Sequence, residues 1–194
     1  MLGGLGYVKT LAALRSDGPA RASFTTAVTA LNEHARVSID PSSWYEGRVL
    51  RCNWHGRISN VVTASPTFTF EFRVGPTSNI AAFTTGALVT STTAHTTVPI
   101  IGEFTLTCQA LGAGTTAKLM GQGWVASRAI VDVSGADVTT TGHPILLAPE
   151  TTPAQGTGFD STVQNVADLF VACQTSAAGN AFQMHQYTLE DLGV

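Results

Sequence analysis

The sequence predicts an all-β protein, an antiparallel β-sandwich with a short N-terminal arm or helix, and three observations carry this prediction. Residues 67–74, Thr-Phe-Thr-Phe-Glu-Phe-Arg-Val, alternate strictly between polar and large apolar side chains, which is the period of a strand with one buried face. The same alternation returns in at least three later segments. Charged residues make up only 12% of the chain, against about a quarter in an average soluble protein, while Thr, Ala and Gly are abundant.

The first strong strand signal spans residues 48–59. Its apolar positions share one face: Leu50, Cys52, Trp54, Gly56 and Ile58. In the next strand, 67–74, the three phenylalanines are predicted to form the centre of the core. Further strands are expected at 80–83, 87–90, 99–110 and 116–130.

The last third of the chain begins with a loop-rich stretch and ends with two strands. A short apolar run occupies 145–147 within the loops of 132–160. The strands at 165–174 and 181–190 flank a short connection that contains a glycine, so they are predicted to form a hairpin. About eight strands with turns every 8 to 15 residues favour a sandwich over a helical or parallel α/β fold.

The N-terminal segment has a different character. Five apolar residues recur every third position, Leu2, Leu5, Val8, Leu11 and Leu14, which is compatible with a short helix or an irregular arm that packs on its own domain or docks elsewhere. Residues 21–46 are compatible with strand or helix. We therefore divide the chain into a leading segment, 1–46, and a β-sandwich domain, 47–194.

Charge and cysteine usage restrict the partners. A net charge of −3 and a pI near 5.9 argue against nucleic-acid binding, and Arg48, Arg51 and Arg57 are interpreted as the solvated face of a strand. Residues 1–14 lack the pattern of a signal peptide, and no stretch has the length of a membrane span, so synthesis in a reducing cytoplasm is expected. The three cysteines are accordingly predicted to be buried free thiols: Cys52, Cys108 and Cys173.

No catalytic or cofactor motif is present. The five histidines have no metal-ligand spacing, and the chain has no nucleophile elbow, phosphate loop or dinucleotide fingerprint. We expect no catalytic residue, no metal and no cofactor, and hence no enzymatic activity. His55 and His185 are expected at the surface or at a subunit contact.

The aromatic residues leave a binding role open. Trp44, Trp54 and Trp124, together with Tyr45, are candidates for a sugar-stacking platform, or alternatively for core or interface packing. Trp54 lies on the inward face of its strand, and Trp124 lies opposite the face shared by Gly121 and Gly123. Trp44 and Tyr45 lie in a predicted loop, so they are the candidate glycan contacts.

Seven segments between residue 56 and the C terminus carry a resemblance to a known family: Gly-Arg-Ile-Ser-Asn at 56–60, Phe-Glu-Phe-Arg-Val-Gly at 70–75, Thr-Thr-Ala-His-Thr-Thr at 92–97, Phe-Thr-Leu-Thr-Cys at 104–108, Leu-Met-Gly-Gln-Gly at 119–123, Gly-Thr-Gly-Phe-Asp-Ser-Thr at 156–162 and Ala-Phe-Gln-Met-His-Gln-Tyr-Thr-Leu-Glu at 181–190. In these turns and strand patterns the chain resembles the jelly-roll structural proteins of tailed bacteriophages. The first 55 residues are not covered by the resemblance.

The resemblance implies a non-enzymatic virion component made in the host cytoplasm, usually a homotrimer, whose partner is the major capsid protein or another virion protein. The leading expectation is a decoration (cement) protein that stabilises the head, with residues 1–17 contacting the shell or a neighbouring trimer. The alternative is a tail, spike or fibre-associated module that binds a receptor or glycan. Neither expectation includes a membrane or nucleic-acid partner.

Overall fold

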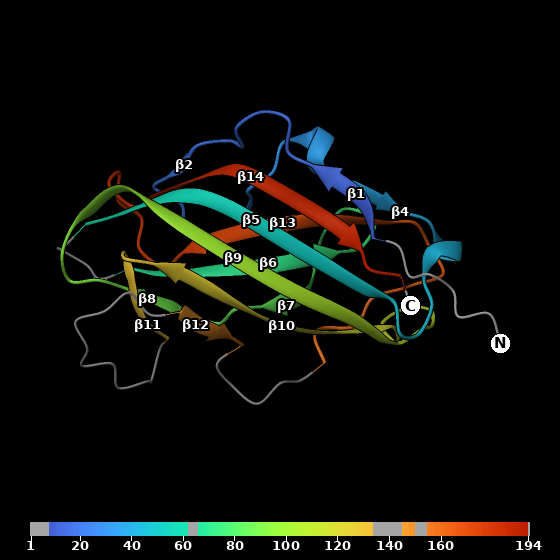
Figure 1. Cartoon of the computed structure of the whole chain (residues 1–194). Coiled ribbons are helices and arrows are strands. Elements are labelled where there is room, and N and C mark those ends of the chain that lie inside the picture. The colour runs from blue at the N-terminus through green and yellow to red at the C-terminus, as the bar shows by residue number, and fades with distance from the viewer. Residues whose placement is uncertain (1–7, 62–65, 134–144, 150–154, 194) are drawn as a thin grey trace.

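The computed structural model describes residues 8–61, 66–133, 145–149 and 155–193. These residues form two antiparallel sheets of seven strands each (Figure 1). Sheet A has the order β1 (Lys9–Ala13), β14 (Ala181–Asp191), β5 (Val49–Asn60), β9 (His95–Ala110), β10 (Lys118–Ser127) and β12 (Ile145–Ala148), and β2 (Arg21–Ala22) also pairs with β14. Sheet B has the order β11 (Ile130–Val133), β8 (Leu88–Thr90), β6 (Thr67–Val74), β13 (Asn165–Cys173) and β3 (Val28–Thr29), with β4 (Val37–Ile39) on β13 and β7 (Ile80–Thr84) on β6.

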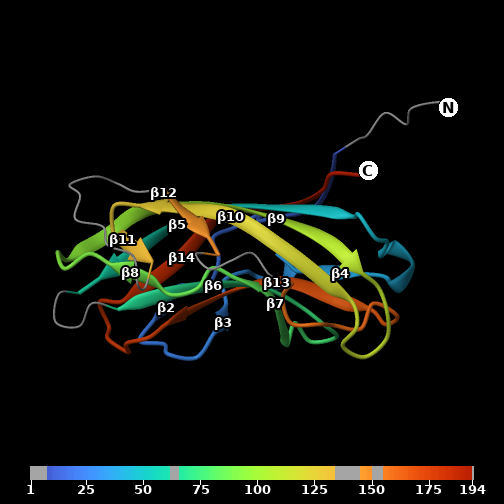
Figure 2. The same ribbon diagram turned by 90° about the horizontal axis from the view of Figure 1, so that it is seen from below.

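The two sheets lie face to face as the layers of a jelly-roll-like sandwich (Figure 2). In chain order, β1 and β2 lie in sheet A, β3 and β4 in sheet B, β5 in sheet A, β6 to β8 in sheet B, and β9 and β10 in sheet A. The last four strands then alternate, with β11 and β13 in sheet B and β12 and β14 in sheet A. The helical content of the described residues is limited to two 3-10 turns, η1 (Glu33–Ala35) and η2 (Pro41–Ser43). None of the described helices is long and apolar enough to cross a membrane. The predicted all-β sandwich is therefore confirmed.

Aromatic side chains fill the space between the sheets. Phe68, Phe70 and Phe72 of β6 are fully buried, as their alternation predicts. The indole of Trp54 lies 4.5 Å from the ring of Phe70 in the opposite sheet, with the rings of Phe104 and Phe182 beside it. Such tilted and edge-on contacts add to the burial energy of each ring. This cluster joins sheet A to sheet B.

Glycine makes room for the indole in this cluster. A Cβ atom on Gly102 of β9 would lie 2.4 Å from Cζ2 of Trp54, far inside van der Waals contact. Gly102 pairs directly with Trp54 across the β5–β9 ladder. Because Gly102 has no side chain, the indole of Trp54, the largest fully buried side chain, can pack against the backbone of β9.

The N-terminal segment differs from the expectation of a helix or a loose arm. Residues 9–13 are a strand, β1, paired with the end of β14, and the side chains of Leu11 and Leu14 pack against the core. The three-residue spacing of leucines does not produce a helix because the pairing with β14 provides the backbone hydrogen bonds. Leu2 and Leu5 lie outside the described residues. Of the proposed contact arm, 1–17, the described part belongs to sheet A.

The described part of the leading segment, residues 8–46, contributes strands to both sheets. β1 and β2 pair with β14, whereas β3 and β4 pair with β13. Both sheets thus contain strands from residues 8–46. The division expected at residue 46 does not separate two packed bodies, because the core encloses side chains from both sides of it.

Two further expectations are corrected. The strands at 165–174 and 181–190 were expected to pair as a hairpin, but β13 lies in sheet B and β14 in sheet A, so the short connection between them crosses the sandwich. Arg48 was assigned to a solvated face, but its side chain is buried and bonded to Asp191. Arg48 has the same parity as Leu50 and Cys52, which places it on the inward side.

The cysteines are free and buried, as expected. Burial raises the pKa of each thiol, most strongly for Cys52, which lies between the sheets beside Tyr187. A thiol that resists deprotonation is a poor nucleophile and a poor metal ligand. The three cysteines therefore act as small apolar side chains of the core.

Candidate functional site

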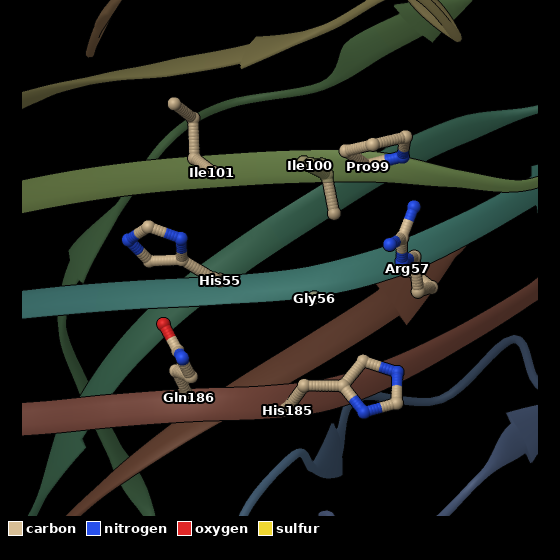
Figure 3. Close-up of a pocket in the computed structure, with 8 residues that line it drawn as sticks. All are labelled: His55, Gly56, Arg57, Pro99, Ile100, Ile101, His185 and Gln186. Atoms are coloured by element: carbon tan, nitrogen blue, oxygen red, sulfur yellow. The ribbon is translucent and has the colours of Figure 1, made fainter.

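A shallow groove opens on the outer face of sheet A, the face turned away from the core. It has a volume of about 350 Å³ and crosses three neighbouring strands, β14, β5 and β9 (Figure 3). We call it the outer groove, and its lining residues are His55, Gly56, Arg57, Pro99, Ile100, Ile101, His185 and Gln186. Polar side chains from β14 and β5 line one side of it, and an apolar wall along β9 lines the other.

A β-bulge in β14 creates this surface. The register between β14 and β5 shifts between Met184 and Gln186, so His185 is an extra residue in its strand. Met184 and Tyr187 both remain buried, while His185 and Gln186 both lie on the outer face. A regular strand would present one side chain here instead of two, and re-aiming side chains at binding sites is a common use of bulges.

The loop before β2 supports the bulged strand. Asp17 Oδ1 lies 2.8 Å from Nδ1 of His185, which fixes the orientation of that imidazole. The N–H of Gly18 donates to the Met184 carbonyl at 2.7 Å, and Gln183 Nε2 donates to the Gly18 carbonyl. A Cβ atom on Gly18 would lie 2.4 Å from the carbonyl oxygen of Ala30, so only glycine allows this close approach.

The centre and one end of the outer groove carry hydrogen-bonding groups without strong internal partners. His55 faces Ile101 on β9 and Gln186 on β14, and its ring is exposed. Arg57 is also exposed and makes a single long contact, 3.5 Å from Nη1 to the Thr97 carbonyl. Among the described residues no carboxylate lies within ion-pair distance of its guanidinium. These side chains can bond a ligand without first breaking a strong protein contact.

An apolar strip continues the same face beyond the outer groove. Ile101 pairs with Ala126 of β10, and Ala126 pairs with Ile145 of β12. Two residues before Ala126 on the same face of β10, Trp124 pairs with Leu147. Ile145 and Leu147 are 66% and 73% exposed, and Trp124 is partly exposed. Of the three tryptophans, only Trp124 presents its ring on the outer face of a sheet.

The structure separates the two candidate glycan contacts. The Trp44 side chain is only 5% exposed, because its ring packs 4.9 Å from that of Phe159 and lies under the Arg48 guanidinium. That ring has no free face for a sugar in this arrangement. Tyr45 is 37% exposed and lies far along the sheet from the outer groove, beside the end of β9. Contact of Tyr45 with a glycan stays a prediction.

Among the carboxyl groups that the structure describes, two have shifted pKa values, and in both cases burial or hydrogen bonds within the fold cause the shift. Burial raises the pKa of Asp168, opposed by a 2.8 Å hydrogen bond from the Thr29 hydroxyl and by Arg36 at 3.2 Å. Hydrogen bonds from Thr162 and from the Gly114 N–H lower the pKa of Asp160, which shapes a turn. Neither carboxylate lines the outer groove. No group of three His, Cys, Asp or Glu residues suited to a metal occurs in the described parts of the chain.

The sequence contained a signal for the outer groove that simple alternation overlooked. In residues 182–189 the apolar positions are Phe182 and Met184, then Tyr187 and Leu189, so the period slips by one residue at the adjacent polar pair His185 and Gln186. A slip of this kind indicates a bulge. The neighbours of that pair on β5 and β9, in contrast, follow only from the pairing of strands.

Fold and site together define a β-sandwich with a ligand-sized polar groove and an adjacent tryptophan on one sheet face. No family model matches the chain, and no curated protein matches it. Among solved structures, similarity is found to the CBM2 module of the Dit of Lactobacillus casei BL23 phage J-1, at 7% identity and a TM-score of 0.37 over 97% of this chain and 98% of that one.

Two further solved structures are similar over nearly the whole chain. Peanut lectin has 8% identity and a TM-score of 0.33, covering 100% of this chain and 95% of its own. The carbohydrate recognition domain of Emp47p has 8% identity and a TM-score of 0.30, covering 96% and 97%. At TM-scores below 0.5 these likenesses are too loose to assign a function, which has to be argued from the residues of this chain.

Proposed function

We propose that the protein is a non-enzymatic virion protein of a tailed bacteriophage, a tail, spike or fibre-associated module that binds a glycan receptor across the outer face of sheet A. The phage context comes from the sequence resemblance between residue 56 and the C terminus. The observation that carries the binding role is the placement of Trp124 and the polar outer groove on one sheet face. As a virion protein it assembles with itself, as a homotrimer, and with another virion protein.

The chemistry of this face matches a carbohydrate. Sugars have apolar C–H faces, which pack on an aromatic ring, and a rim of hydroxyl groups, which need both donors and acceptors. Trp124 offers the ring, and His55 and Gln186 each offer a donor and an acceptor. Adjacent strands are about 4.8 Å apart, so the surface from β14 to β10 spans roughly 14 Å. That length fits an oligosaccharide better than a single sugar.

The binding role predicts losses at two positions and none at a matched third. Trp124→Ala and Gln186→Ala should each weaken binding about tenfold or more, because one removes the stacking surface and the other an amide that bonds hydroxyl groups. The measurement is adsorption of labelled protein to host cells, together with a glycan array. Gln164→Ala, which replaces an exposed glutamine just before β13 of sheet B, is the control and should bind like the parent protein. Full binding by both Trp124→Ala and Gln186→Ala would refute the proposal.

A capsid decoration protein is the second candidate, and the exposed edge of sheet A favours it. Ile145 and Leu147 on β12 would be unusual side chains to leave in water, and a neighbouring subunit or a shell would cover them. Repeated contacts of about 1,000 Å² or more give a decorating trimer its avidity.

Imaging of intact virions by cryo-electron microscopy distinguishes the two candidates. We expect density of this sandwich at the tail tip, on spikes or on fibres. Density at threefold positions of the head would instead make it a decoration protein. A truncation that tests attachment should remove residues 1–7 only, because loss of β1 would expose the edge of β14.

A further inference from the structure

We propose that the outer groove selects acidic glycans, with Arg57 binding the carboxylate or phosphate group of the sugar. This inference rests on the proposed glycan-binding function and names the class of ligand. Arg57 stands at the end of the groove formed with Pro99, and His55 stands two residues away on the same strand and the same face (Figure 3). The Cα atoms of residues 55 and 57 are therefore about 7 Å apart, so one acidic pyranose ring can contact both side chains.

Among the described residues, Arg57 has no acidic partner on this face, and its one contact is the long hydrogen bond to the Thr97 carbonyl. The other outward arginine of β5, Arg51, is bonded to Glu190 with a 2.7 Å contact. Asp17 is held by His185. Within the part of the chain that the structure describes, the remaining acid on this face is Glu103, which pairs with Trp124 and Asn53 and not with Arg57. An exposed guanidinium with no acidic partner can bind carboxylate and phosphate oxygens in a bidentate manner, here through the Nε and Nη2 atoms, which donate to none of the described residues.

The supporting groups complete an oxyanion site. His55 and Gln186 face one another across the β5–β14 pair, and each can donate an N–H to a ligand oxygen. The bulge at His185 places two polar side chains of β14, His185 and Gln186, at the outer groove. Pro99 and Ile101 form the opposite, apolar wall of the outer groove.

The test compares acidic sugars with neutral counterparts that lack the anionic group or the residue that carries it. The probes are 3′-sialyllactose with lactose, trigalacturonic acid with its methyl ester, and glucose 1-phosphate with glucose, each titrated into the intact protein, alongside a glycan array and adsorption to host cells. We expect the acidic member of at least one pair to bind about tenfold or more tightly. Preference for the carboxylates or for the phosphate identifies the source of the anion.

Variants assign the preference to Arg57. Arg57→Gln should abolish the difference between acidic and neutral probes, and Arg57→Lys should retain only part of it, since lysine lacks the planar fork. Arg128→Gln, an exposed arginine in the turn between β10 and β11, is the matched control and should change nothing. A melting curve verifies that each variant is folded.

Two results overturn the inference and are distinguishable from each other. Equal binding of neutral and acidic probes, with loss of both in Trp124→Ala, would retain the glycan-binding function and reject the anionic class. Absence of binding to every glycan of the array and to host cells would reject the proposed function and the inference with it.

Discussion

Replacing Trp54 with alanine is expected to lower the free energy of unfolding by about 3–5 kcal/mol, the largest effect of any single substitution considered for this chain. The indole is fully buried and contacts aromatic rings of both sheets, Phe70 on one side and Phe104 and Phe182 on its own. Its removal leaves a cavity that cannot close, because the flanking strands are held by ladders on both sides. Urea unfolding followed by circular dichroism measures the change.

Trp124→Ala is the matched control for this prediction. It removes the same side chain from sheet A, but from the outer face, where the ring is partly in water. Its cost should be about 1 kcal/mol or less. Equal losses for the two tryptophans would contradict the assignment of Trp54 to the core, and would also undermine the use of Trp124→Ala as a folded binding variant.

Asp191→Ala is expected to cost about 2–4 kcal/mol, the second largest effect, because it leaves the charge of Arg48 buried and unpaired. The Arg48 side chain is 4% exposed, and its Nε and Nη2 atoms donate to Asp191 Oδ2 at 3.1 and 2.9 Å. Its Nη1 donates to the Ser43 carbonyl at 2.9 Å, so the same guanidinium ties the end of β14 to the loop that carries Trp44. Thermal or urea unfolding at pH 7 gives the loss.

The neighbouring ion pair provides the control. Glu190 and Arg51 form a contact of similar length, but their side chains are 19% and 36% exposed. Glu190→Ala removes the same charge one residue earlier in β14 and should cost about 0–1 kcal/mol. In a double-mutant cycle, Arg48→Met should reduce the loss caused by Asp191→Ala, since no charge is then stranded. Additive effects would show that the two side chains do not act as a pair.

The proposed site depends on contacts that are remote in sequence. His55, Ile101 and Gln186 lie about 46 and 85 residues apart and become neighbours only because β5 pairs with both β9 and β14. Strand alternation predicts the face of each residue but not its partner, since every strand of the right length and pattern is an equally good neighbour. Trp44 illustrates the same limit: its loop position suggested exposure, and Phe159 and Arg48 cover it.

Pairing also explains the two strand assignments that local sequence got wrong. The short link between β13 and β14 is compatible with a hairpin, but β13 pairs within sheet B and β14 within sheet A, so the link passes from one sheet to the other. β1 is a strand despite a three-residue leucine spacing because β14 offers it an edge. In both cases a few local preferences of less than about 1 kcal/mol per residue are outweighed by burial and by a complete ladder.

Alternation within single segments was enough to predict the all-β class, the positions of β5, β6, β13 and β14, the inward faces of β5 and β6 and the burial of the cysteines. It was not enough for β9, which begins at His95 and not at residue 99, or for the expected strand 116–130, which is divided between β10 and β11 in different sheets. The bulge at His185 also corresponds to a one-residue slip in that alternation. The tertiary structure alone decided which strands are neighbours, which arginine is buried against Asp191 and which is free, and that Trp124 shares a face with the outer groove. Those features are set by the long-range matching of sheet faces and edges, and no single segment contains that information.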